Sequence, residues 1–113
     1  MRPESKKLIW DAREAASAAR AFIADRDYPA YAGDPMVRSA VERQLEIVGE
    51  ALHRLSRADP EVAGKIEDLP RIVGLRNVLA HGYADIDDRL VWDVVQSKLP
   101  PLQSLLESLL REP

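Results

Sequence analysis

The segment from residue 76 to residue 83 gathers the side chains of this 113-residue chain that could do chemistry. It holds Arg76, Asn77, His81 and Tyr83, and His81 is one of only two histidines in the sequence. A histidine can accept or donate a proton near neutral pH, and the rigid fork of an arginine suits the charge on a phosphate. RNA cleavage without a metal ion needs both actions: proton transfer at the 2′-hydroxyl or the leaving oxygen, and stabilisation of the phosphate. Arg76 and His81 could supply them together.

The same two residues also have a purely structural interpretation. Arg76 could be a core arginine paired with a carboxylate. His81 could cap the end of a helix, where the helix dipole favours its protonated form. The spacing between the two residues does not decide between the interpretations.

Helical periodicity places Arg76 on the apolar side of its own element. A helix is predicted from about Leu69 to residue 80 or 81, ending at Gly82. At about 100° per residue, the core-facing arc of this helix holds Arg76 together with Leu69, Ile72, Val73, Leu79 and Ala80. An arginine there is costly unless its donors are paired, so a carboxylate must lie inside the bundle or the face must open into a polar cleft. His81 lies about 140° around the helix from Arg76, so side-chain reach, helix termination or a second subunit must bring the two together.

The rest of the chain has the periodicity of helices, without sustained strand alternation. It predicts a single all-α domain over residues 1–113, an antiparallel up-and-down bundle of four to five helices. The predicted helices run from about 5 to 25, from 35 to about 55, from 60 to near 64, from 69 to 81, and from 88 to the end with a kink or restart at Pro100-Pro101. Asp34-Pro35 and Asp59-Pro60 have the residues that favour a helix start, a capping aspartate followed by proline.

Several large side chains are assigned by position alone. Tyr28 and Tyr31 are expected in a loop because proline and glycine interrupt the pattern around them, and Trp10 and Trp92 are expected to be packing residues. The last helix carries more leucine than one face needs: Leu102, Leu105, Leu106, Leu109 and Leu110. A second copy of the chain could cover the surplus, which favours a homodimer.

Composition excludes several classes of function. The sequence has no cysteine, which excludes disulfides, thiol nucleophiles and cysteine-held metal sites. The net charge of −3 argues against a broad nucleic-acid-binding surface, so any RNA contact should be local, at a basic cleft. Residues 1–7 lack the apolar stretch of a signal peptide, and no apolar run reaches the ~20 residues that cross a bilayer. We therefore expect a cytoplasmic protein with no membrane partner.

Residues 76–83, Arg-Asn-Val-Leu-Ala-His-Gly-Tyr, resemble the Arg-x4-His-x-Tyr motif of the HEPN superfamily, and in particular its HepT-like toxins. Residues 41–51 (VERQLEIVGEA) resemble the second-helix signature of that family. Further similar segments lie before the motif at 69–75 and after it at 85–87 and 91–95. The resemblance covers roughly residues 36–105, and the motif positions show no departure from it.

The resemblance implies a helical-bundle homodimer in which Arg76 and His81 of both subunits line a shared cleft. It implies a metal-independent endoribonuclease toxin that acts on messenger or transfer RNA without a cofactor, with Arg76 and His81 catalytic and Asn77 supporting them. It also implies a nucleotidyltransferase antitoxin, which neutralises the toxin by transferring AMP to Tyr83. An AMP group there would add bulk and negative charge where an RNA phosphate would lie.

Other charged residues leave alternatives open. Arg43, Glu46 and Glu50 share a face of the second long helix and could line the cleft or pair with Arg76, or could form a solvated stripe. Glu50-x-x-His53 has the spacing of helical di-iron sites, but His81 has Val78 three residues before it rather than a second glutamate, so no metal site is predicted.

The alternative function is a catalytically silent HEPN-type module that binds a nucleotide, RNA or a partner protein through the same cleft. The acidic net charge favours this alternative, and the intact Arg76 and His81 favour the enzyme.

Overall fold

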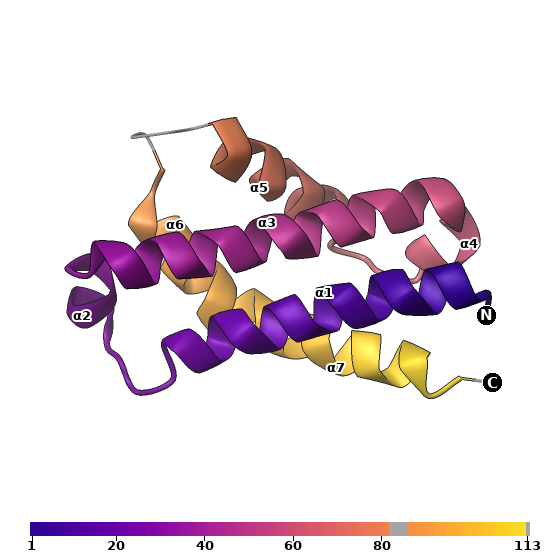
Figure 1. The fold of residues 1–113 in the computed structure, drawn as a ribbon, viewed down its shortest axis with the longest axis horizontal. Helices are drawn as coiled ribbons and strands as arrows, with labels where there is room; N and C mark the ends of the chain where they lie inside the picture. The colour runs from indigo at the N-terminus through magenta and orange to yellow at the C-terminus, as the bar shows by residue number, and fades with distance from the viewer. Residues whose placement is uncertain (82–85, 113) are drawn as a thin grey trace.

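The computed structural model describes residues 1–81 and 86–112, and these residues form helices joined by short connections (Figure 1). The α-helices are α1 (Pro3–Phe22), α2 (Tyr28–Ala32), α3 (Pro35–Ala58), α4 (Pro60–Ala63), α5 (Leu69–His81), α6 (Asp88–Asp93) and α7 (Leu99–Leu110), with a π-helical segment η2 (Val94–Lys98) before α7. The predicted all-α class is confirmed. The bundle is more finely divided than the four to five helices predicted, because α2 was not expected and the last predicted helix is divided into α6, η2 and α7.

The two long helices α1 and α3 lie side by side and antiparallel, and α7 packs along α1 (Figure 1). Alanines on the inner face of α1 allow its neighbours to approach closely, and larger side chains of α3 and α7 fill the space between them. The buried residues that form this core include Ala12, Ala15, Ala16 and Ala19 of α1, Leu45, Leu52 and Leu55 of α3, and Leu102, Leu106 and Leu109 of α7. Helix α5 packs on the outside of α3 (Figure 1).

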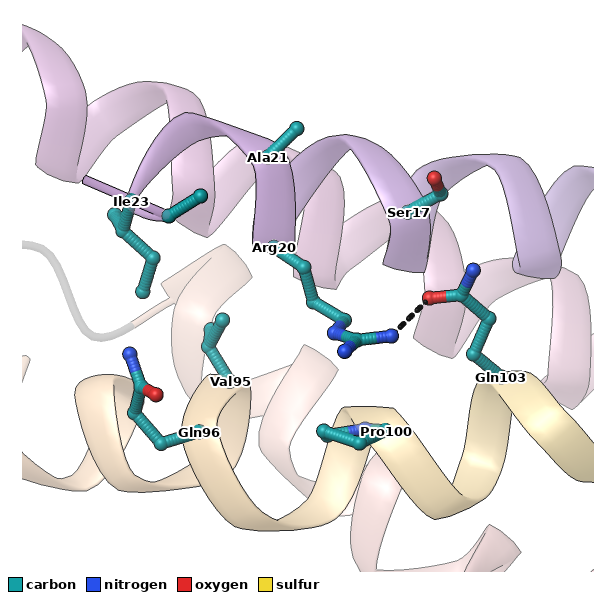
Figure 2. A pocket seen from close by; sticks show the side chains of 9 residues that line it. Ser17, Arg20, Ala21, Ile23, Val95, Gln96, Pro100 and Gln103 are labelled. Carbon is teal, nitrogen blue, oxygen red and sulfur yellow. Dashed lines mark hydrogen bonds between the residues drawn. The ribbon is translucent and has the colours of Figure 1, made fainter.

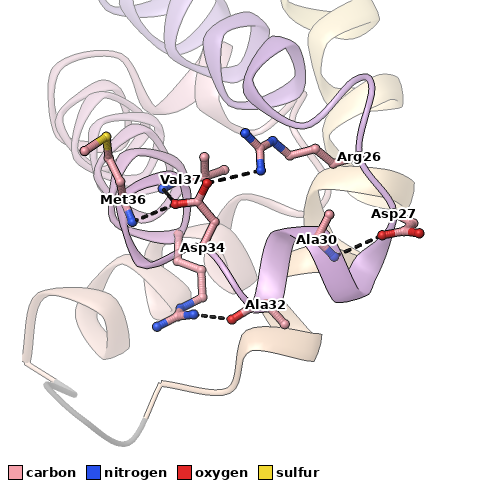
Figure 3. A network of polar contacts seen from close by, with 8 residues as sticks. Arg26, Asp27, Ala30, Ala32, Asp34, Met36 and Val37 are labelled. Atoms are coloured by element: carbon pink, nitrogen blue, oxygen red, sulfur yellow. Dashed lines mark hydrogen bonds and ion pairs between the residues drawn. The ribbon is translucent and has the colours of Figure 1, made fainter.

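Aspartate side chains start four of the helices. Asp34 accepts hydrogen bonds from the first amides of α3, and Asp59 accepts one from the amide of Val62 in α4, as predicted. Asp27 and Asp87 cap α2 and α6 in the same way. Figure 3 shows the caps at Asp27 and Asp34, with Arg26 paired to the Asp34 carboxylate.

The prediction that Tyr28 and Tyr31 lie in a loop is wrong, because both lie in the short helix α2. The Asp27 cap and Pro29 in the first turn favour a helix start there. Tyr31 is fully buried, and its ring centroid lies 5.5 Å from that of Trp92. Burial raises the pKa of the Tyr31 hydroxyl well above its ordinary value. Tertiary packing therefore stabilises a helix that the local sequence pattern did not indicate.

The predicted kink or restart at Pro100-Pro101 takes the form of a π-helical turn. Neither proline has an amide N–H to continue the α-helical hydrogen bonds. The N–H of Leu99 instead donates to the carbonyl of Val94, the i to i+5 bond of a π-helix. One extra residue is thus accommodated while the chain stays helical from α6 into α7.

The leucines of the last helix are not surplus. Leu102, Leu106 and Leu109 are buried in the core of the single chain, and Leu105 and Leu110 pack partly buried against it. This helix therefore gives no argument for a homodimer, and the homodimer itself stays a prediction. No helix formed by residues 1–81 or 86–112 is long and apolar enough to span a membrane.

The start of α1 is tied to α4 through a buried serine. Ser5 is fully buried, and its hydroxyl donates to Asp59 Oδ2 at 2.6 Å. This hydrogen bond is the main reason why the pKa of Asp59 lies below its ordinary value. The ionised carboxylate therefore stabilises the folded state at neutral pH, and the contribution is lost as the pH falls through the pKa that Asp59 has in the folded protein.

We expect Asp59→Asn to lower the free energy of unfolding at neutral pH and to lose this effect in acid, because the wild-type carboxyl is protonated there. Urea unfolding of both proteins between neutral pH and about pH 2 measures the difference. Asp25→Asn, which removes an exposed carboxylate in the turn after α1, is the control. If Asp59→Asn lowered the free energy of unfolding by the same amount at every pH, the ionised Asp59 carboxylate would not be the stabilising group.

Candidate active site

Arg76 points from α5 toward α3 and meets the carboxylate of Glu50. Its Nη2 lies 2.7 Å from Glu50 Oε2, and its Nη1 donates to Asn77 Oδ1 at 2.8 Å. The Arg76 side chain is 32% exposed, so the guanidinium reaches solvent. Both solutions expected for an arginine on the apolar arc are realised: a carboxylate pairs with it, and the face opens into a cleft.

Gly49 determines how closely α5 approaches α3 at this point. A Cβ atom at residue 49 would lie 2.3 Å from Arg76 Cβ and 2.9 Å from Arg76 Cγ, closer than such atoms come in proteins. Only glycine leaves room for the stem of Arg76 against the backbone of α3. Glycine in a helix interior costs about 1 kcal/mol relative to alanine. A glycine in the middle of α3, such as Gly49, therefore indicates close packing against a neighbour, and the sequence analysis did not use this signal.

The cleft beside Arg76 has a volume of about 490 Å³ and lies between α1, α3 and α5. Its charged lining residues are the acidic Asp11, Glu14, Glu46 and Glu50 and the basic Arg43, Arg54 and Arg76. Arg43, Glu46 and Glu50, which the sequence offered as cleft residues, all line it. Arg54 and the two carboxylates of α1 were missed, although Glu50 and Arg54 have the i, i+4 spacing of a helical ion pair.

The cleft arginines are paired with carboxylates. Arg43 Nη1 lies 3.3 Å from Glu46 Oε2, and Arg54 Nε lies 3.1 Å from Glu50 Oε1. Glu50 therefore bridges two arginines, one on its own helix and one on α5. The interpretation of a solvated charged stripe is wrong for this residue. Since Glu50 is engaged in this way, the Glu50-x-x-His53 spacing has no metal-binding arrangement, and no group of three possible metal ligands occurs in the described part of the chain.

The other motif residues lie apart from the cleft. His81 is the last residue of α5, is exposed and does not line the cleft. Asn77 is exposed on the same helix and contacts Arg76. Tyr83 lies outside the described residues. One chain therefore brings Arg76, Asn77 and Glu50 together and leaves His81 on another side of α5, as the helical spacing indicates.

An apolar groove of about 370 Å³ lies between α5 and the α6–η2 segment. Val78 and Leu90, 53% and 49% exposed, line it together with the partly buried Ile72, Leu75 and Val94. Val78 lies about 60° around the helix from His81 and about 160° from Arg76. Val78 is therefore the groove residue nearest to His81 around α5, whereas Leu75 and Ile72 lie about 120° and 180° from His81.

A third hollow, of about 360 Å³, separates α1 from η2 and the start of α7 (Figure 2). Arg20 Nη1 donates to Gln103 Oε1 across it at 2.8 Å, and no residue of the 76–83 motif lines it. It contributes nothing to the candidate active site.

The comparison with known proteins gives the family of this helical protein. Residues 12–109 match the family described as "Ribonuclease HepT-like", and the chain belongs to that family. The relatives include "Putative RNase MJ1380" of Methanocaldococcus jannaschii, which is 36% identical over 104 residues, or 90% of this chain and 93% of the relative.

Two further relatives have similar names. "Putative RNase TTE0752" of Caldanaerobacter subterraneus subsp. tengcongensis is 30% identical over 79 residues, or 70% of each chain. "Probable ribonuclease HepT" of Thermococcus cleftensis is 27% identical over 113 residues, or 96% of this chain and 98% of the relative. No solved structure matches the chain.

We expect Gly49→Ala to lower the free energy of unfolding by about 1–3 kcal/mol, because the added methyl group forces α5 away from α3. Gly74→Ala is the matched control within α5, since a Cβ there meets nothing within 4 Å. That change should raise the free energy of unfolding by about 0.5–1 kcal/mol. Denaturant unfolding of the two variants measures both. Equal effects would show that Gly49 is not needed for the α3–α5 contact.

Proposed function

We propose that this protein is a metal-independent endoribonuclease toxin whose catalytic residues are Arg76 and His81. The observation that carries the proposal is Arg76 at the cleft, held by Glu50 and Asn77 with its guanidinium partly exposed. Family membership and relatives named as ribonucleases support it. Arg76 would stabilise the charge of the scissile phosphate, and His81 would accept the 2′-hydroxyl proton or protonate the leaving oxygen.

The separation of Arg76 and His81 on α5 favours a site shared by two copies of the chain. The two residues lie about 140° apart around α5, so the backbone of one regular helix does not direct both toward one atom. A partner that covered the groove at Val78 and Leu90 would contact α5 at Val78, about 60° around the helix from His81. In such a homodimer, His81 of one copy would act with Arg76 of the other.

The proposed control of the toxin is chemical modification by a nucleotidyltransferase antitoxin. It would transfer AMP from ATP to the Tyr83 hydroxyl, forming a phosphodiester bond to the tyrosine oxygen and releasing pyrophosphate. The added negative charge, two residues after His81, would repel an RNA phosphate.

The second candidate function is the catalytically silent binding module. The cleft holds four carboxylates and three arginines, and this acidic balance favours it over a cleft that attracts RNA. The enzyme remains the better supported proposal because the relatives are named as ribonucleases.

We expect the wild-type protein to cleave total RNA in excess EDTA, and His81→Ala to cleave it about 100-fold to 10,000-fold more slowly, since the proton-transfer group is lost. His53→Ala removes the other histidine, which is on α3, and should cleave like the wild type. Gel analysis of the RNA and of the product ends measures the rates and the nucleophile. A wild-type protein that is inactive although its mass shows no AMP would overturn the ribonuclease and leave the binding module.

We expect Val78→Glu to convert a dimeric wild-type protein into a monomer, because a charge on the lining of the apolar groove opposes burial there. Sedimentation equilibrium measures the mass of the species in solution. Met36→Glu is the matched control, since Met36 is exposed at the start of α3 and lies outside the groove. A wild-type protein that stays monomeric at all concentrations would contradict the shared site.

A further inference from the structure

Glu50 divides its carboxylate between two arginines. Oε1 lies 3.1 Å from Arg54 Nε, and Oε2 lies 2.7 Å from Arg76 Nη2. Arg54 lies one turn further along α3, whereas Arg76 comes from α5. The three side chains form an Arg54–Glu50–Arg76 triad along one wall of the cleft.

The oxygen that faces Arg76 is protected from water. The Glu50 side chain as a whole is 39% exposed, but Oε2 is buried and accepts no hydrogen bond of standard geometry from any described residue. Its contact with Arg76 is an ion pair. If Arg76 turned away, this oxygen would lose the cation that it contacts at 2.7 Å. The arrangement therefore opposes rotation of Arg76 out of the cleft.

The guanidinium of Arg76 is fixed at both ends. Nη2 meets Glu50, and Nη1 donates to Asn77. A planar group held at two of its nitrogens has a defined orientation before any substrate arrives, and its remaining N–H groups stay available. Fixing a group in advance avoids the entropy cost of ordering it during the reaction.

The charge of the triad depends on Arg54. A lone pair of Glu50 and Arg76 would be neutral and would attract a phosphodiester weakly. With Arg54 the triad has a net charge of +1, from two guanidinium groups and one carboxylate. When a phosphate binds Arg76, Glu50 also stays paired with Arg54.

We propose that Glu50 is a positioning residue, which holds Arg76 in the orientation that meets the scissile phosphate, and that Arg54 keeps the triad positively charged for RNA. The inference rests on the proposed function, because it assigns the phosphate of an RNA substrate to Arg76. The opposite role would be inhibition, in which Glu50 neutralises Arg76 and its removal speeds cleavage.

The first test is Glu50→Gln, which keeps the shape of the side chain and removes its charge. We expect kcat for RNA cleavage to fall about tenfold to 100-fold with little change in KM, because Arg76 is no longer held in place. Glu61→Gln, at an exposed site in α4 outside the cleft, should behave like the wild type. Thermal unfolding of each variant monitors folding.

The outcomes separate the two proposals. A wild-type protein that cleaves RNA, with Glu50→Gln equal to it or faster, overturns the positioning role alone. An inactive wild-type protein overturns the proposed function instead.

The second test compares Arg54→Ala with Arg57→Ala, which removes an exposed arginine on α3 outside the cleft. The ligand is RNA methylated at every 2′-oxygen, which cannot be cleaved through that oxygen. Arg54→Ala should weaken binding and reduce the slope of log Kd against log salt by about 0.7, the value for one phosphate contact on a single strand. Equal slopes for the two variants would overturn the role of Arg54.

The third test needs no activity. In ¹⁵N relaxation measurements, the Nε–H of Arg76 should be rigid in the wild type and as mobile as that of exposed Arg57 in Glu50→Gln. An Arg76 guanidinium that is already mobile in the wild type, or that stays rigid in Glu50→Gln, overturns the positioning role even if no RNA is cleaved.

Discussion

The contact between α5 and α3 at Gly49 is the constraint on which the site depends. Helix α5 has a single buried residue, Leu79, whose full burial contributes only about 1.5–3 kcal/mol. Its position on the bundle depends also on the partly buried Leu69, Ile72 and Leu75, on the space at Gly49 and on the ion pair of Arg76 with Glu50. The helix that carries the motif therefore packs mainly through partly buried side chains, on the outside of α3.

The charges around the cleft explain why this placement matters. The chain has a net charge of −3, and carboxylates outnumber arginines in the cleft. An arginine with free rotation in these surroundings would exchange among several carboxylates, each attractive to it. Glu50 gives Arg76 one partner, and Arg54 compensates the charge that Glu50 introduces. An acidic protein can in this way present a local positive charge without a basic surface.

Sequence periodicity predicted most of the helices because their signals are local. Asp34 and Asp59 cap helices as their spacing to proline indicates. The errors occur where tertiary contacts decide. The packing of Tyr31 on Trp92 stabilises α2, and Trp10, expected to be a packing residue, is about half exposed with Lys7 over its ring. The leucines of α7 were called surplus because a sequence does not show how many neighbours each leucine has.

For the site, the sequence predicted that Arg76 needs a partner, and the structure identifies that partner as Glu50. A helical wheel placed this arginine on an apolar arc and required a partner, but it could not choose Glu50 among the acidic residues, since the choice depends on how α5 lies on α3. Gly49, next to Glu50 in sequence, determines that choice through the space it leaves.

The same helical wheel also separates Arg76 from His81 within one chain. The angle of about 140° between Arg76 and His81 follows from helix geometry, and the contact at Gly49 directs Arg76 toward α3. For both residues to act on one bond, side-chain reach, the end of α5 at His81 or a second copy of the chain must bring them together, and the exposed Val78 offers an apolar contact for such a copy.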